Sequence, residues 1–241
     1  MIVVVARNGD VAARELVARW EAHDACLLTP AALSTAGWRF RPGEPHGSVA
    51  VLNGRRTSVR EIRGVVTRLV CVTEADLPHI EQADRAYVAA EMTAFLLSWL
   101  SSLNCRVINR ATPSGLAGPN WRTEQWTHLA ARIGVPVDRV SRSAIRGSAP
   151  AFQSSPIKLS VTVVGDACFG APDAIRASWA RRVAKVARVD LLEVELSGGE
   201  GEPIFLGARV CPDEITSEVA DAILDFLVGS SSRSVSLGAS A

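Results

Sequence analysis

The chain has 241 residues, of which 48% are hydrophobic and 21% charged, so it can bury the core of one large or two small domains. Its formal net charge is +1, and the chain as a whole therefore lacks the positive field that nucleic acid or an anionic membrane would attract. We expect neither partner.

Residues 2 to 6 form a β-branched run that predicts a buried strand, and Asp10 is placed to cap the helix that follows. Asn53-Gly54, between apolar residues 48 to 52 and 57 to 59, predicts a hairpin. The pattern then predicts a strand over 64 to 72, a helix over 80 to 103, a strand over 106 to 108, a loop over 112 to 119 and a helix over 120 to 133. We assign residues 1 to 141 to an α/β domain with a mainly parallel sheet.

Residues 142 to 159 are rich in Ser, Ala, Arg and Pro and predict a connector. Strands are expected over 160 to 164 and 167 to 170, then a helix over 174 to 187, strands over 190 to 196 and 203 to 210, and a helix over 214 to 227. Residues 160 to 228 thus form an α+β unit with antiparallel pairing. The Ser-rich residues 229 to 241 are predicted to be a disordered tail.

The cysteines, histidines and apolar runs indicate a cytoplasmic protein without a metal site. The five cysteines are widely spaced and mostly lie in apolar runs, which is typical of reduced core thiols. The four histidines never fall at the spacing of a zinc motif. The longest apolar stretch, residues 87 to 100, is shorter than the roughly 20 residues that span a bilayer, and residues 1 to 6 predict a strand rather than a signal peptide.

Several strings resemble the ATP-grasp superfamily, particularly its RimK-like and peptide-modifying carboxylate–amine ligases. The strings are Tyr87-Val88-Ala89-Ala90-Glu91, Val107-Ile108-Asn109, Leu116-x-Gly118-Pro119-x-Trp121-Arg122, Val161-Thr162-Val163-Val164-Gly165-Asp166 and Asp190-Leu191-Leu192-Glu193-Val194-Glu195. The resemblance implies an α/β fold with a pre-ATP-grasp-like N-terminal domain and a small α+β lobe like the ATP-grasp C-terminal subdomain. The family also has a central lid subdomain, which we expect to be absent here, because only connector-like residues lie between Val137 and Ser160.

The family's chemistry requires lysines on the phosphates, oxygen ligands on magnesium and a lid that excludes water. This sequence departs from it at three positions and in the segment where the lid would lie. Where the lid would lie, before Ser160, Lys158 is the only lysine. Ser160 itself stands where the family usually has an arginine. Gly207 and Arg209 stand where it has a Glu-x-Asn motif, and an arginine there would repel a cation. We therefore expect no independent ATP turnover and no bound ATP or magnesium.

The first hypothesis is a catalytically degenerate ATP-grasp-like protein that acts as a binding or accessory subunit, recruits a peptide or a partner ligase, and forms a homodimer or a hetero-complex. Its contact residues would be Glu91, Asn109, Arg110, Trp121 and Arg122. Each also has a purely structural interpretation.

Those interpretations concern packing and solvation. Glu91 shares a helical stripe with three aromatic residues and is expected in apolar surroundings, where it would pair with Arg7 or Arg110. Trp121 would pack under its loop with Arg122 in solvent. The loop after Asn109 would be an ordinary turn.

Two alternatives remain open. In one, the chain is a minimal ATP-dependent carboxylate–amine ligase that a partner subunit completes, with Lys158 on the nucleotide and Glu195 on magnesium. Glu193 and Glu195 would otherwise be the solvated face of a strand. In the other, the chain is a small-molecule binding module unrelated to ligases, with its site in the first-half α/β layer and the loop over 109 to 119.

Overall fold

A computed structural model describes residues 1–44, 47–137, 158–171, 173–198 and 203–229. It divides the chain into two compact units, which we call unit 1 (1–120 and 213–241) and unit 2 (121–212). The sequence-based division differs from this one at two helices. The predicted connector and tail fall almost wholly outside the described residues, except that Lys158 and Leu159 begin a strand and Gly229 ends a helix.

Unit 1 is built on a parallel sheet with the strand order β2-β1-β5-β6. Its strands are β1 (Ile2–Val5), β2 (Ala25–Leu28), β5 (Gly64–Thr67) and β6 (Arg106–Ile108). A separate antiparallel pair, β3 (Val49–Leu52) and β4 (Arg55–Ser58), turns at Asn53-Gly54, and this confirms the predicted hairpin. The strand predicted over 64 to 72 ends early, at Thr67.

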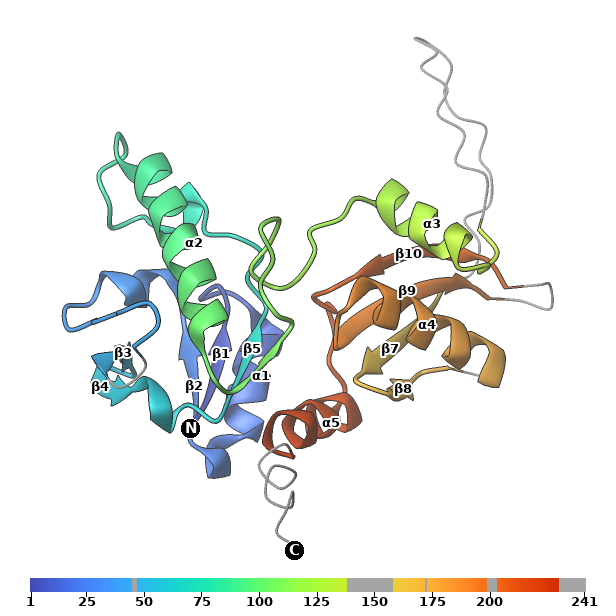
Figure 1. The fold of residues 1–241 in the computed structure, drawn as a ribbon, viewed down its shortest axis with the longest axis horizontal. Helices are drawn as coiled ribbons and strands as arrows, with labels where there is room; N and C mark the ends of the chain where they lie inside the picture. The colour runs from blue at the N-terminus through green and yellow to red at the C-terminus, as the bar shows by residue number, and fades with distance from the viewer. Residues whose placement is uncertain (45–46, 138–157, 172, 199–202, 230–241) are drawn as a thin grey trace, which may run out of the picture. The chain divides into compact units, whose positions relative to one another are not determined.

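Helices cover both faces of this sheet (Figure 1). α2 (Arg85–Ser102) packs on one face through Leu96, Trp99 and Leu100, which share the core cluster with Val3 and Val65. α1 (Val11–Arg19) begins at its predicted cap, since Asp10 Oδ1 accepts a hydrogen bond of 2.9 Å from the Ala13 amide.

α5 (Ser217–Val228) belongs to unit 1, although the sequence analysis assigned it to the second domain. It packs against β5 and β6, where a Cβ on Gly64 would lie 2.9 Å from Leu227 Cβ. Arg106 of β6 stabilises the last turn of α5 by donating a 2.6 Å hydrogen bond to the Phe226 carbonyl. The Arg106 guanidinium also lies 4.3 Å from the centre of the Phe226 ring. The helix therefore completes the first core.

Unit 2 is an antiparallel sheet with the order β10-β9-β7-β8, which confirms the predicted antiparallel α+β pattern. Its strands are β7 (Lys158–Val164), β8 (Ala167–Phe169), β9 (Leu191–Ser197) and β10 (Phe205–Arg209). α4 (Ala174–Ala187) contacts β7, β8 and β9, while α3 (Thr123–Arg132), which the sequence analysis placed in the first domain, contacts β10 and α4. The apolar side chains of β7 and β9, such as Val161, Val163 and Val194, are buried.

Among the described residues, no helix has both the length and the hydropathy to cross a bilayer. All five cysteines are free thiols, and burial raises the pKa of Cys26 and of Cys105 to about 11. These two thiols are therefore protonated and unreactive near neutral pH.

Candidate functional site

The polar side chains that the sequence analysis singled out in the second half meet on one face of the unit 2 sheet. Glu195 of β9 lies directly opposite Ser160 of β7 on one side and Gly207 of β10 on the other. Arg209 pairs in the same way with Glu193, two residues from Glu195. Because side chains alternate along a strand, all five positions share the face opposite the buried valines and leucines.

Glu195 is held between two cations. Lys158 Nζ lies 3.3 Å from Glu195 Oε2, and Arg209 Nη2 donates to Glu195 Oε1. Arg209 also reaches Glu193, with 3.3 Å between its Nε and Glu193 Oε2. The side chains of both glutamates are 15% exposed, whereas Lys158 is 60% and Arg209 is 40% exposed. These four side chains bring two positive and two negative groups together.

The electrostatics keep Glu195 ionised. Burial alone would raise the pKa of its carboxyl group, but hydrogen bonds and positive charge from Arg209 and Lys158 outweigh burial, so its pKa lies below the usual value. The carboxylate therefore accepts hydrogen bonds from protein cations.

The residues at this face do not fit a magnesium ion. A divalent ion needs several oxygen ligands that are free to coordinate it. Here both oxygens of Glu195 are engaged by cations, Arg209 brings a positive charge, and Gly207 has no side chain. Throughout the chain that the structure describes, no three His, Cys, Asp or Glu residues gather as a metal site would require. There is space for a longer side chain, because a Cβ on Gly207 would meet only Glu195 Oε2, at 3.8 Å.

In unit 1, Glu91 is not where the sequence analysis expected it. Its helical stripe passes from a 69% exposed Tyr87 to a 1% exposed Trp99, and Glu91 lies at the exposed end. The expectation of apolar surroundings is therefore wrong, because the stripe turns gradually out of the core. The suggested partner Arg7 is paired with Asp76 instead, at 2.9 Å.

Asn109 and Arg110 follow β6 but differ in exposure. Asn109 is 1% exposed, whereas Arg110 is exposed at the start of the loop that leads to Pro119. In unit 2, Trp121 lies against the buried Trp126, with ring centres 4.7 Å apart, and Arg122 is exposed just before α3. The geometry matches the interpretation in which Trp121 packs and Arg122 extends into solvent.

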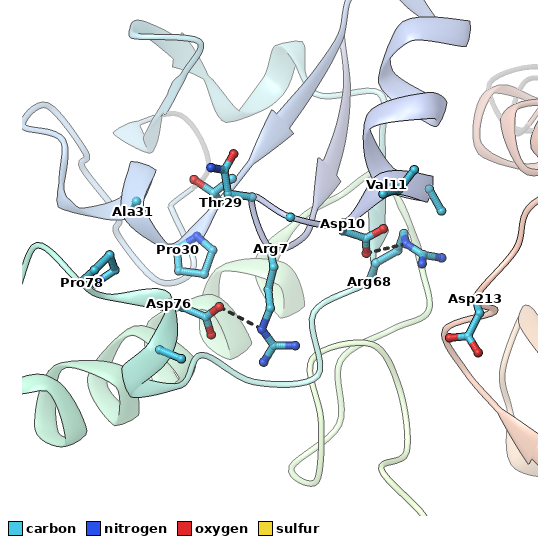
Figure 2. Close-up of a pocket in the computed structure, with 14 residues that line it drawn as sticks. Arg7, Asp10, Val11, Thr29, Pro30, Ala31, Arg68, Asp76, Pro78 and Asp213 are labelled. Atoms are coloured by element: carbon cyan, nitrogen blue, oxygen red, sulfur yellow. Dashed lines mark hydrogen bonds and ion pairs between the residues drawn. The ribbon is translucent and has the colours of Figure 1, made fainter.

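Unit 1 also has a pocket of about 720 Å³ at the carboxyl ends of its strands (Figure 2). The segments that follow β1, β2 and β5 line it, together with Asp76, Pro78 and Asp213. It lies where the strand order reverses, since the chain runs from β1 to β2 on one side and to β5 on the other. Such a crevice is the usual place for a ligand in an open α/β sheet.

Two arginine–aspartate pairs flank this pocket (Figure 2). Arg7 Nε donates to Asp76 Oδ1 at 2.9 Å, and Arg68 Nε donates to Asp10 Oδ2 at 2.9 Å. The sequence analysis did not identify these residues as a site. The sequence does not reveal the order of the strands in the sheet. Arg7 and Arg68 lie near each other because β1 and β5 are adjacent strands.

Comparisons with known proteins identify the fold. No protein-family profile and no curated protein matches the chain. Among solved structures, the macrocyclase MdnC from Microcystis aeruginosa MRC, bound with its precursor peptide MdnA, is similar with a TM-score of 0.67 at 12% identity, covering 95% of this chain and 99% of MdnC.

Two further solved structures have a similar fold. The ATP-grasp ligase PsnB, complexed with a minimal precursor, Mg and ADP, gives a TM-score of 0.68 at 12% identity over 94% of this chain and 98% of PsnB. A RimK-domain ATP-grasp protein from Sphaerobacter thermophilus DSM 20745 gives 0.53 at 13% identity over 95% and 99%.

Proposed function

We propose that this chain, which has an ATP-grasp-like fold, takes part in peptide modification as a binding subunit that performs no ATP chemistry of its own. The observation that carries the proposal is the state of Glu195, which lies opposite Gly207 and is engaged by Arg209 and Lys158. Both of its oxygens already contact protein cations, and a nearby guanidinium repels a divalent ion, so the carboxylate is a poor metal ligand.

The chemistry of the fold family explains why this matters. Forming an acyl phosphate from a carboxylate and ATP requires cations to neutralise the charge that develops on the phosphates. At this sheet face the cations are protein side chains, and both are already neutralised by glutamates. A triphosphate would have to displace Glu195 from Arg209 and Lys158 before it gained their charge.

A peptide partner is the binding role best supported by the neighbours, because MdnC and PsnB were solved with precursor peptides. For this chain we propose that Glu91 and Arg110, which are exposed on unit 1, and Arg122, which is exposed on unit 2, each contact the peptide or a complete ligase from their own unit, while Trp121 packs on Trp126. Asn109, being buried, would support the loop beneath Arg110. We also propose that the chain works as a homodimer or in a hetero-complex.

ADP release tests the proposal. The purified chain is assayed with Mg·ATP alone and then together with any ligase and short peptides that neighbouring genes encode. We expect no ADP release by the chain alone, and an increased rate or affinity of the ligase for its peptide in the mixture. ADP release that requires this chain's own Lys158 and Glu195 in the mixture would instead establish a minimal ligase completed by a partner.

A designed variant provides the positive control. Gly207→Glu with Arg209→Asn restores the family's motif on β10 and frees Glu195 from its main cation. Because the register places position 207 opposite Glu195, the two carboxylates and the new amide would lie on one face. We expect the double variant to bind Mg²⁺ at least about tenfold more tightly than the unmodified chain. Equal Mg²⁺ binding by both proteins would refute the assignment of this face.

The pocket of unit 1 supports a second candidate, a small-molecule binding module. Its volume suits a small metabolite, and Arg7, Asn8 and Thr29 supply polar groups. Screening polar metabolites by thermal shift, with Arg7→Met as the comparison, tests this candidate. A ligand that stabilises both proteins equally would not occupy this pocket.

A further inference from the structure

Residues 39–63 of unit 1 carry an unusual density of positive charge. The segment contains six arginines and two glutamates, although the whole chain has a net charge of only +1. All six arginines are exposed, and they lie on the β3–β4 hairpin or in the segments beside it. We call them the arginine surface: Arg39, Arg41, Arg55, Arg56, Arg60 and Arg63.

The hairpin that carries these arginines is firmly packed. Ala50 and Leu52 of β3 belong to the buried core, and so do Val59 and Ile62, which follow β4. Next to Arg39, the ring of Trp38 stacks edge-on against Phe95 and Trp99 of the core. The positive charges are therefore held on a rigid frame, which lowers the entropy cost of binding.

The strand register places two of the arginines on one outward face. Arg39 bridges to Val49, which pairs with Ser58 on its other side, and Arg56 pairs with Val51. Positions 49 and 51 are two residues apart, so Arg39 and Arg56 point to the same side of the hairpin. Gly37 packs against Val51 and the aliphatic part of the Arg56 side chain. A Cβ at position 37 would lie 3.3 Å from Val51 Cγ2 and 3.4 Å from Arg56 Cγ.

The two glutamates within the segment neutralise only part of this charge. Glu44 lies 3.4 Å from Arg41, and Glu61 turns toward the main chain, where its Oε1 accepts a 3.1 Å hydrogen bond from the Ser58 amide. Among the described residues, Arg39, Arg55 and Arg56 form no ion pair with a carboxylate. Like charges this close repel one another, so the arrangement costs stability unless a partner neutralises it.

We propose that the arginine surface binds an acidic, extended peptide segment of a partner. Guanidinium groups recognise carboxylates through paired N–H donors, and spaced arginines on a hairpin match acidic residues spaced along a peptide. Single-stranded nucleic acid fits less well, because it needs exposed aromatic rings for base stacking. Trp38 and Phe40, the aromatic residues of this region, stack against core rings instead.

This inference names the chemistry of the partner in the binding role proposed above, but it depends on unit 1 alone. The two proposals can fail separately. If the chain hydrolyses ATP and still binds acidic peptide, only the proposed function is wrong. If it neither hydrolyses ATP nor prefers acidic peptide, only this inference is wrong.

The experiment measures fluorescence anisotropy of a labelled twelve-residue peptide of alternating Glu and Ser with the full chain. A Lys–Ser peptide and a twelve-nucleotide single strand are the comparison probes. The test variant is Arg39→Glu, Arg55→Glu and Arg56→Glu together. The matched control changes three other exposed arginines, Arg14, Arg132 and Arg181, to Glu, so that the net charge falls equally.

We expect the Glu–Ser peptide to bind at low salt, to bind at least about tenfold more weakly to the test variant, and to bind the control within about twofold of the unmodified chain. Raising the ionic strength should weaken binding because these charges are exposed. Equal weakening in the test and control variants, or tighter binding of the oligonucleotide than of the peptide, would overturn the proposal. Circular dichroism of both variants confirms that they fold.

Discussion

Replacing Arg209 with Met tests the charge arrangement around Glu195 and gives a defined pH dependence. Met keeps the aliphatic stem but leaves Glu193 and Glu195, each 15% exposed, without their shared guanidinium. A hydrogen bond to a charged group contributes about 1.5–3 kcal/mol. Because Arg209 is 40% exposed, screening by solvent lowers the expected loss to about 1–2 kcal/mol at pH 7.

The loss should disappear in acid. The folded-state pKa of Glu195 lies below its unfolded value, so the ion pair stabilises the fold above the unfolded pKa, near about 4.3, and that contribution is lost as the pH falls through the folded pKa. Without Arg209 the carboxyl pKa rises. The difference in unfolding free energy between the two proteins should therefore be full at pH 7 and shrink as the pH falls toward the lowered folded-state pKa of Glu195.

Urea denaturation followed by circular dichroism at pH 7 and at a series of lower pH values down to pH 3 measures this difference. The control is Lys158→Met, which removes the 60% exposed partner of the same carboxylate and should change the unfolding free energy by less than about 0.5 kcal/mol. The reasoning would be refuted if the Arg209 variant had the same unfolding free energy as the unmodified chain at pH 7. It would also be refuted if the difference between the two were equally large at pH 7 and at pH 3.

Three further predictions concern unit 1. Gly64→Ala should lower the unfolding free energy by about 1–3 kcal/mol, because the new Cβ would lie 2.9 Å from Leu227 Cβ; an unchanged urea midpoint would argue against α5 packing there. Arg68→Met should lower it by about 2–4 kcal/mol, since it leaves the 17% exposed carboxylate of Asp10 without this partner; calorimetry that shows the melting temperature unchanged would contradict the pair. Cys26, with a pKa of about 11, should resist alkylation by iodoacetamide at pH 8 until the chain unfolds, and rapid labelling of the native chain would contradict its burial.

Local chemistry made much of the fold predictable. Asp10 caps α1 and Asn53-Gly54 turns the β3–β4 hairpin, because each depends only on residues a few positions away. The end of β5 was not predictable in this way. Leu69 and Val72 are buried outside the strand, and an apolar run does not reveal whether burial comes from a sheet or from a loop over the core.

Long-range placement was beyond the sequence. The apolar face of α5 predicts that one side of the helix is buried, but it does not reveal against which sheet. The same holds for Arg7 and Arg68, which reach one pocket only because β1 and β5 are neighbours. The face around Glu195 was predictable only in part. The strings placed Ser160, Gly207 and Arg209 on strands, and β9 and β10 pair as successive strands, but the pairing of β7 with β9 is again long-range, because β8 and α4 lie between them in the sequence.

Isothermal titration of the full chain with a Mg²⁺ complex of a non-hydrolysable ATP analogue tests the central claim most directly. We predict no measurable heat of binding up to millimolar nucleotide, with or without Mg²⁺, because the oxygens and cations around Glu195 already satisfy one another. Micromolar, magnesium-dependent binding that is lost in Glu195→Gln would contradict the account.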